Sequence, residues 1–152
     1  WLFMFKLGAW LFQWQGRRLQ AKQAKNGVVM SDIQIALVGH CGPDSFALQS
    51  SVMGFVPGSV IHKLNSMDEL NAKMGDLSLL LVNRVLDGGF ESESGIELIR
   101  GLGDDAPPAM LISNFPESLE ESVAAGAVMG YGKQKMRSDE AEAALKSALK
   151  LN

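Results

Sequence analysis

The sequence predicts an α/β protein with a five-stranded parallel sheet and helices on both of its faces. Two observations support this prediction: short apolar runs alternate with segments of helical periodicity, and the alternation repeats five times between Ile33 and Asn152. Runs without polar alternation are typical of strands buried on both faces, as the strands of parallel sheets are. Five such units match the doubly wound, flavodoxin-like arrangement with strand order 2-1-3-4-5.

Each of the five expected strands is a short run of mostly aliphatic residues. They span residues 33–39, 59–64, 77–82, 108–113 and 127–132. The run 77–82 is the most apolar of them, so we expect it at the centre of the sheet.

The expected helices lie between these runs, at residues 43–55, 66–74, 94–102, 116–126 and 138–152. Ser66 and Glu69 have the spacing of a capping box at the start of the second helix. In the last helix, Ser138 is expected as the cap and Ala141 and Leu145 face inward, with Leu149 on the same side. The first helix has four apolar residues at helical spacing: Phe46, Leu48, Val52 and Met53.

Composition and charge narrow the class of protein. The chain has 152 residues with 47% hydrophobic and 20% charged residues, which is typical of one globular domain. It has 1 cysteine, so we expect no internal disulfide and a cytoplasmic location. Only 9 of the 14 Lys and Arg residues lie in residues 30–152, against 17 Asp and Glu, a net charge of about −8. An acidic body without a basic stripe argues against nucleic acid as its partner.

Residues 1–29 differ in kind from the rest of the chain. Residues 1–14 are almost wholly apolar, and the basic residues Arg17, Arg18, Lys22 and Lys25 follow them. The apolar part is shorter than a membrane-spanning helix requires. We expect either an upstream or misassigned extension, with residues 30–152 as the domain, or a segment on a membrane surface, or an ordered packing helix.

Candidate functional residues follow the strands, because sites in doubly wound folds form outside the carboxyl ends of the strands. The residues in these places are Gly39, His40, Cys41, Asn83, Arg84, Ser113, Asn114, Gly132 and Lys133. His40 and Cys41 are adjacent and therefore point in different directions, so a structural role is favoured over metal or redox chemistry. No glycine-rich dinucleotide motif and no catalytic triad is visible. We therefore expect no enzymatic activity.

Residues 31–150 resemble a response regulator receiver domain, the phosphoacceptor module of two-component signalling. The resemblance depends on "LLLVNRVLDGGFESESGIELIRGL" at 79–102, on "PAMLIS" at 108–113 and on "AAGAVMGYGK" at 124–133. It implies an acidic pair after the first strand that holds Mg²⁺ and an aspartate after the third strand that attacks phosphorus. It also implies a Ser or Thr after the fourth strand and a lysine after the fifth, which bind the phosphoryl oxygens.

The chain keeps only part of this implied site. Ser113 and Lys133 match the hydroxyl and the lysine, with Lys135 as a competing candidate. Tyr131 occupies the position of a residue that in this family switches between buried and exposed states, although packing at the sheet edge is its simpler role. Ser113 is equally expected to bind only backbone.

The carboxylates of the implied site are missing. Asn83 stands at the phosphoacceptor position, and a neutral amide is a very poor nucleophile. The acidic pair is replaced by Gly39 and His40, or by His40 and Cys41, depending on the register. Mg²⁺ prefers oxygen ligands, so no cofactor is expected. Asp44 and Asp87 lie in nearby loops and are expected to cap a helix or turn.

These features predict a pseudo-receiver that acts through protein contacts and forms a homodimer through its last helices. Two alternatives stay open. The strand-end pocket could bind a small molecule, or Asp87 or Asp44 could serve as a cryptic phosphoacceptor.

Overall fold

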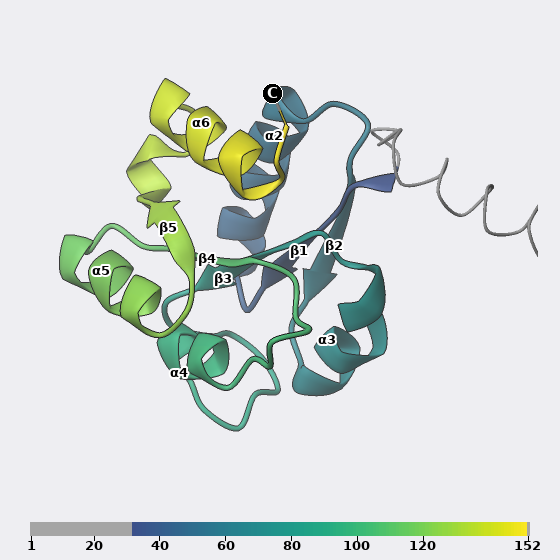
Figure 1. Ribbon diagram of the computed structural model, residues 1–152, viewed down its shortest axis with the longest axis vertical. Coiled ribbons are helices and arrows are strands. Elements are labelled where there is room, and N and C mark those ends of the chain that lie inside the picture. Colours follow the sequence, from purple (N-terminus) through teal and green to yellow (C-terminus); the bar gives the residue numbers. More distant parts are fainter. Residues whose placement is uncertain (1–31, 152) are drawn as a thin grey trace, which may run out of the picture.

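The strands form one parallel sheet in the order β2-β1-β3-β4-β5, which confirms the predicted topology and the central place of the third strand (Figure 1). A computed structural model describes residues 32–151, so the predictions for residues 1–29 lie outside the described residues. The strands are β1 (Gln34–Val38), β2 (Val60–Leu64), β3 (Leu79–Asn83), β4 (Ala109–Ile112) and β5 (Val128–Tyr131).

The described helices lie where the sequence predicts them, with ends that differ by a few residues. They are α2 (Gly42–Phe55), α3 (Met67–Lys73), α4 (Gly95–Arg100), α5 (Pro116–Ala124) and α6 (Asp139–Ala148), with short 3₁₀ turns η2 (Met74–Asp76) and η3 (Lys133–Lys135). Ser66 caps α3 by accepting a hydrogen bond from the backbone N–H of Glu69, and Ser138 caps α6 in the same way. Such caps satisfy backbone donors that the first helical turn leaves free.

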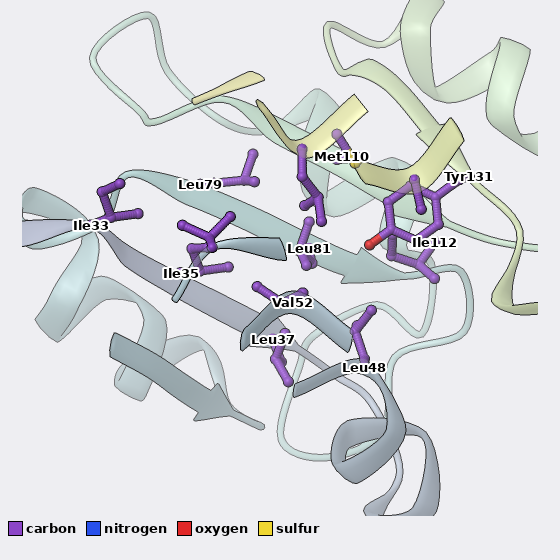
Figure 2. Packing of buried hydrophobic residues seen from close by; sticks show 13 residues of the cluster. Ile33, Ile35, Leu37, Leu48, Val52, Leu79, Leu81, Met110, Ile112 and Tyr131 are labelled. Atoms are coloured by element: carbon purple, nitrogen blue, oxygen red, sulfur yellow. The ribbon is translucent and has the colours of Figure 1, made fainter. Parts of the chain in front are cut away.

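Two layers of helices cover the sheet (Figure 1), so most apolar residues of its strands are buried. Helices α2 and α6 pack on one face, where Leu48 meets side chains of the strands (Figure 2). Leu145 of α6 belongs to the same buried cluster. Helices α3, α4 and α5 cover the other face, where Leu70 and Ile99 are buried. Full burial of one such side chain contributes about 2 kcal/mol.

Of the four apolar residues noted at helical spacing in α2, two face the core and two face outward. Leu48 and Val52 are buried, and Val56 continues their stripe four residues further on. Phe46 is 72% exposed and Met53 is 46% exposed, so both lie on the outer side of the helix. The reason is geometric: residues spaced by four share a face, whereas a spacing of two turns a side chain to the opposite side.

Candidate functional site

The strand register places the candidate residues on one edge of the sheet. Val38 is paired with Val82, and Asn83 is paired with Ile112. Gly39, Asn83 and Ser113 therefore stand at the carboxyl ends of three neighbouring strands, β1, β3 and β4. We call this edge, with the first two residues that follow each of these strands and β5, the strand-end edge.

Asn83 is nearly buried, and its side-chain amide binds two backbone carbonyls. Nδ2 donates to the oxygen of Gly39 at 3.0 Å and to the oxygen of Val85 at 2.6 Å. The oxygen of Gly39 also accepts the backbone N–H of Asp87 at 2.9 Å, so both of its lone pairs are engaged. A carboxylate could not make these bonds, because it has no hydrogen to donate.

Gly39 has a backbone conformation that excludes an acidic residue. Its φ is +68°, in the left-handed region that favours glycine. A Cβ at this position would lie 2.6 Å from Cδ2 of Leu86 and 3.0 Å from its Cα. The position directly after β1 therefore has neither the φ nor the space for aspartate.

His40 points away from the strand-end edge and into the protein. It is 1% exposed, and its Nε2 donates to the oxygen of Leu81 at 2.9 Å. Nδ1 is buried and has no hydrogen-bond partner among residues 32–151. Burial lowers the pKa of His40 to about 4, so the ring is neutral at pH 7. Cys41 is half-buried at the N-cap of α2, and its side chain makes no capping bond to the helix.

Ser113 and Tyr131 are both buried. Oγ of Ser113 accepts a hydrogen bond from the backbone N–H of Phe115 at 3.2 Å. The hydroxyl therefore binds backbone, which is one of the two roles expected for it. The ring of Tyr131 packs in the core with Ile112 (Figure 2). Its hydroxyl has no hydrogen-bond partner in the described part of the chain, and burial raises the pKa of Tyr131 well above its usual value.

Lys133, rather than Lys135, reaches the strand-end edge. Its Nζ donates to Oδ2 of Asp44 at 2.5 Å, whereas Lys135 pairs with Glu140 away from this edge. The hydrogen bond from Lys133 holds the pKa of Asp44 below its usual value. The lysine thus meets a carboxylate, but the carboxylate comes from the first turn of α2 rather than from the end of β3.

A cavity of about 160 Å³ opens between the ends of β3 and β4. The Arg84 guanidinium lies 4.7 Å from the ring centroid of Phe115, a cation–π distance. The residues that line the cavity are Asn83, Arg84, Val85, Ile112, Ser113, Asn114, Phe115 and Lys133. Arg84 and Asn114 were expected here from their place after a strand. Phe115 was not, because an aromatic residue before a helix has no distinctive sequence signal.

Carboxylates are sparse at this edge. Asp87 is exposed, and its backbone N–H binds Gly39. Among residues 32–151, no group of three or more His, Cys, Asp or Glu side chains could hold a metal ion. The described part of the edge therefore offers Asp44 alone beside Lys133.

No protein-family model matches the sequence, and no curated protein matches it. Solved structures do match. The signal receiver domain of a DNA-binding response regulator from Colwellia psychrerythraea 34H shares 13% identity at a TM-score of 0.60, covering 78% of this chain and 98% of that one. A response regulator from Thermotoga maritima shares 17% identity at a TM-score of 0.61, with the same coverage of 78% and 98%. The BeF₃-activated DrrB receiver domain shares 15% identity at a TM-score of 0.59, covering 78% and 97%. The chain thus has the fold of response regulator receiver domains.

Proposed function

We propose that this chain is a receiver-like domain of two-component signalling that does not take up phosphate at Asn83 and acts through protein contacts. Receiver domains are signalling modules, so the proposal assigns no enzymatic activity. The fold shared with three receiver-containing proteins supports the class of protein. The hydrogen bonds of Asn83 and the backbone of Gly39 support the proposed absence of phosphoacceptor chemistry at the strand-end edge.

The observation that carries the proposal is the hydrogen bonding of Asn83. Its amide nitrogen lies between the oxygens of Gly39 and Val85, at the end of the strand where a receiver has its nucleophilic aspartate. An amide has neither the charge to bind Mg²⁺ nor the nucleophilicity to attack phosphorus. The neighbouring Gly39 cannot be exchanged for an acid without strain.

Incubation with acetyl phosphate and Mg²⁺, followed by intact mass measurement, tests this proposal. We expect the mass to stay unchanged. A mass gain of one phosphoryl group that survives in the Asp44→Asn and Asp87→Asn variants would contradict the proposal. The variant Asn83→Asp separates the missing nucleophile at position 83 from the missing acidic pair after β1. If this single substitution restores phosphorylation, Asp44 suffices as the acidic metal ligand.

A cryptic phosphoacceptor is the second candidate, and the contact between Lys133 and Asp44 favours Asp44 over Asp87. A lysine beside a carboxylate is one part of phosphoryl-transfer chemistry. In the same experiment, a mass gain that is lost in Asp44→Asn and kept in Asp87→Asn would support this candidate. A small molecule in the strand-end cavity stays a prediction, and a ligand that binds there would raise the melting temperature by mass action.

A homodimer through the last helices also stays a prediction, and exposed apolar residues support it. Val123 on α5 and Val128 and Met129 on β5 are 39%, 36% and 54% exposed. Exposed apolar residues that lie close together are typical of protein contacts. Sedimentation velocity of the wild type and of Met129→Glu tests this face, with Phe46→Glu on α2 as the matched control. We expect only Met129→Glu to lower the association.

The location of the protein in the cell and its binding to nucleic acid stay predictions. Within residues 32–151, every helix is too short or too polar to cross a membrane. The cytoplasmic location and the absence of nucleic-acid binding, both expected from the sequence, are predictions that no observation above tests.

A further inference from the structure

A second cavity lies away from the strand-end edge, beside α4. Its volume is about 370 Å³, within the range of small-molecule sites. Leu86 at its base is buried, and the other apolar side chains around it are half-buried against the core of that face. The lining residues are Met67, Leu86, Phe90, Glu91, Ser92, Glu97, Leu98, Gly101 and Leu102.

Backbone hydrogen bonds fix the walls of this cavity. Gly89 donates to the oxygen of Asn65 at 2.7 Å and accepts from the N–H of Met67 at 3.1 Å. Leu86 donates to the oxygen of Glu93 at 2.7 Å, which closes the loop between β3 and α4. These bonds hold the loop against the start of α3, so the cavity exists before any ligand arrives. A preformed site costs a ligand less ordering than a mobile one.

The charged residues around the cavity are acidic. Glu91 and Glu97 line it, and its lining contains no lysine or arginine among the described residues. Glu97 already pairs with Arg100, whereas Glu91 forms no ion pair within residues 32–151. An apolar cavity with a free carboxylate at its rim is complementary to an apolar body with a positive charge.

The apolar residues that line the cavity are buried or half-buried, which argues for a small ligand rather than a protein. A stable protein contact needs roughly 800 Å² on each partner. None of the strongly exposed large apolar residues of residues 32–151 lines this cavity. Those residues are Phe46, Met53, Val60, Val85, Phe115, Val123, Val128 and Met129.

We propose that the cavity beside α4 binds a small organic cation with a flat apolar body. The ring packs against Phe90 and Leu98, and the positive group lies at the carboxylate of Glu91. This site shares no residue with the strand-end cavity and is independent of the proposed function.

Three probes with one ring system and different charges test the proposal on the full chain: tryptamine, indole and indole-3-acetate. Binding is followed in ¹⁵N-labelled protein by amide shifts, at low salt because salt screens exposed charges. We expect tryptamine to saturate shifts at Ser92 and Gly101. We expect indole to bind several-fold more weakly, and indole-3-acetate at least ten-fold more weakly.

Matched variants separate charge from shape. Glu91→Gln should lower tryptamine affinity about three-fold and leave indole binding unchanged, because an exposed charge pair is weak. Glu93→Gln is the control, since Glu93 is exposed in the same loop and does not line the cavity. Gly101→Leu should abolish binding of both probes. Its backbone tolerates a side chain, because an added Cβ meets nothing closer than 3.6 Å.

Several outcomes would overturn the proposal. These are absence of saturable tryptamine binding in the millimolar range, equal affinity for all three probes, or shifts confined to the strand-end edge. Cross-peaks between a tryptophan of the chain itself and Leu98 without added probe would also overturn it, because the cavity would then have another occupant.

Discussion

The two halves of the strand-end edge differ in the polar groups they hold. On the β1–β3 half, the polar groups bind backbone: the Asn83 amide binds the oxygens of Gly39 and Val85, and His40 turns inward to Leu81. On the β4–β5 half, Lys133 still reaches the edge and forms an ion pair with Asp44. The first half holds neutral hydrogen-bonding groups. The second half holds a charged pair.

This difference shows which half of the edge depends on backbone geometry and which on side chains. A lysine on a flexible stem can pair with a carboxylate from a distant part of the chain, as Lys133 does with Asp44, 89 positions away. An acid after β1 would need a backbone that Gly39 does not have. The backbone conformation therefore determines which residues the β1–β3 half can hold, whereas only side-chain contacts determine the arrangement of the β4–β5 half.

The largest effect is expected from Gly39→Asp. The substitution places an L side chain at φ +68° and a Cβ 2.6 Å from Leu86, so we expect a loss of about 4 kcal/mol in the free energy of unfolding. Urea denaturation measures it. Gly42→Asp is the matched control, because an added Cβ there meets nothing within 4 Å and the first turn of α2 favours an acid. Equal stability of the two variants would contradict the claim that the backbone at Gly39 excludes an acid.

The next effect is a pH dependence caused by His40. Burial lowers the pKa of His40 from 6.5 to about 4, so between these values the unfolded chain binds more protons than the folded one. The free energy of unfolding should therefore fall as the pH is lowered from 6.5 to 4, by about 3 kcal/mol.

Denaturation of the wild type and of His40→Gln across pH 4 to 7 measures this difference. The variant should lack this part of the slope. Asp44, whose pKa is depressed, adds stability that is lost only at lower pH, as the pH falls through its folded-state pKa. Identical slopes for both proteins would show that His40 titrates normally, which means that it is not held inside.

A smaller loss in the free energy of unfolding is expected when the side-chain hydrogen bonds of Asn83 or of Ser113 are removed. Asn83→Leu removes the bonds to Gly39 and Val85 and should cost about 1.5 kcal/mol. Ser113→Ala removes one bond, from the N–H of Phe115, and should cost about 1 kcal/mol. Thermal and urea unfolding of both variants give the ranking. A neutral Asn83→Leu would mean that its amide does not hold the β1–β3 half together.

The smallest effect is expected for the ion pair of Asp44 and Lys133. Both side chains are about one third exposed, so solvent screens the attraction. A double-mutant cycle with Asp44→Asn and Lys133→Met should give a coupling of about 0.5 kcal/mol that shrinks in high salt. A coupling of several kcal/mol that does not depend on salt would show that the β4–β5 half is held as firmly as the β1–β3 half.

The sheet and its helices could be predicted from the sequence, because local patterns determine them. The apolar run at 77–82 led to the central strand, and Ser66 with Glu69 led to the cap of α3. The site could be predicted only as a set of strand ends. The direction of His40 and the partner of Lys133 depend on contacts between distant parts of the chain, which no local pattern encodes. Apolar residues on both sides of α2 leave its inner face ambiguous in the sequence, and only the structure shows that Phe46 and Met53 lie on the outer side.

The side-chain amide of Asn83 can be observed directly by ¹⁵N-labelled NMR during a titration with Mg²⁺. Its two protons are bonded to the oxygens of Gly39 and Val85, so their cross-peaks should be well dispersed and should stay in place up to millimolar Mg²⁺. Saturable shifts of these peaks together with those of Gly39 and Asp44 would show a metal at the edge of β1 and β3. Such a result would contradict the account of a receiver fold without its phosphoacceptor chemistry.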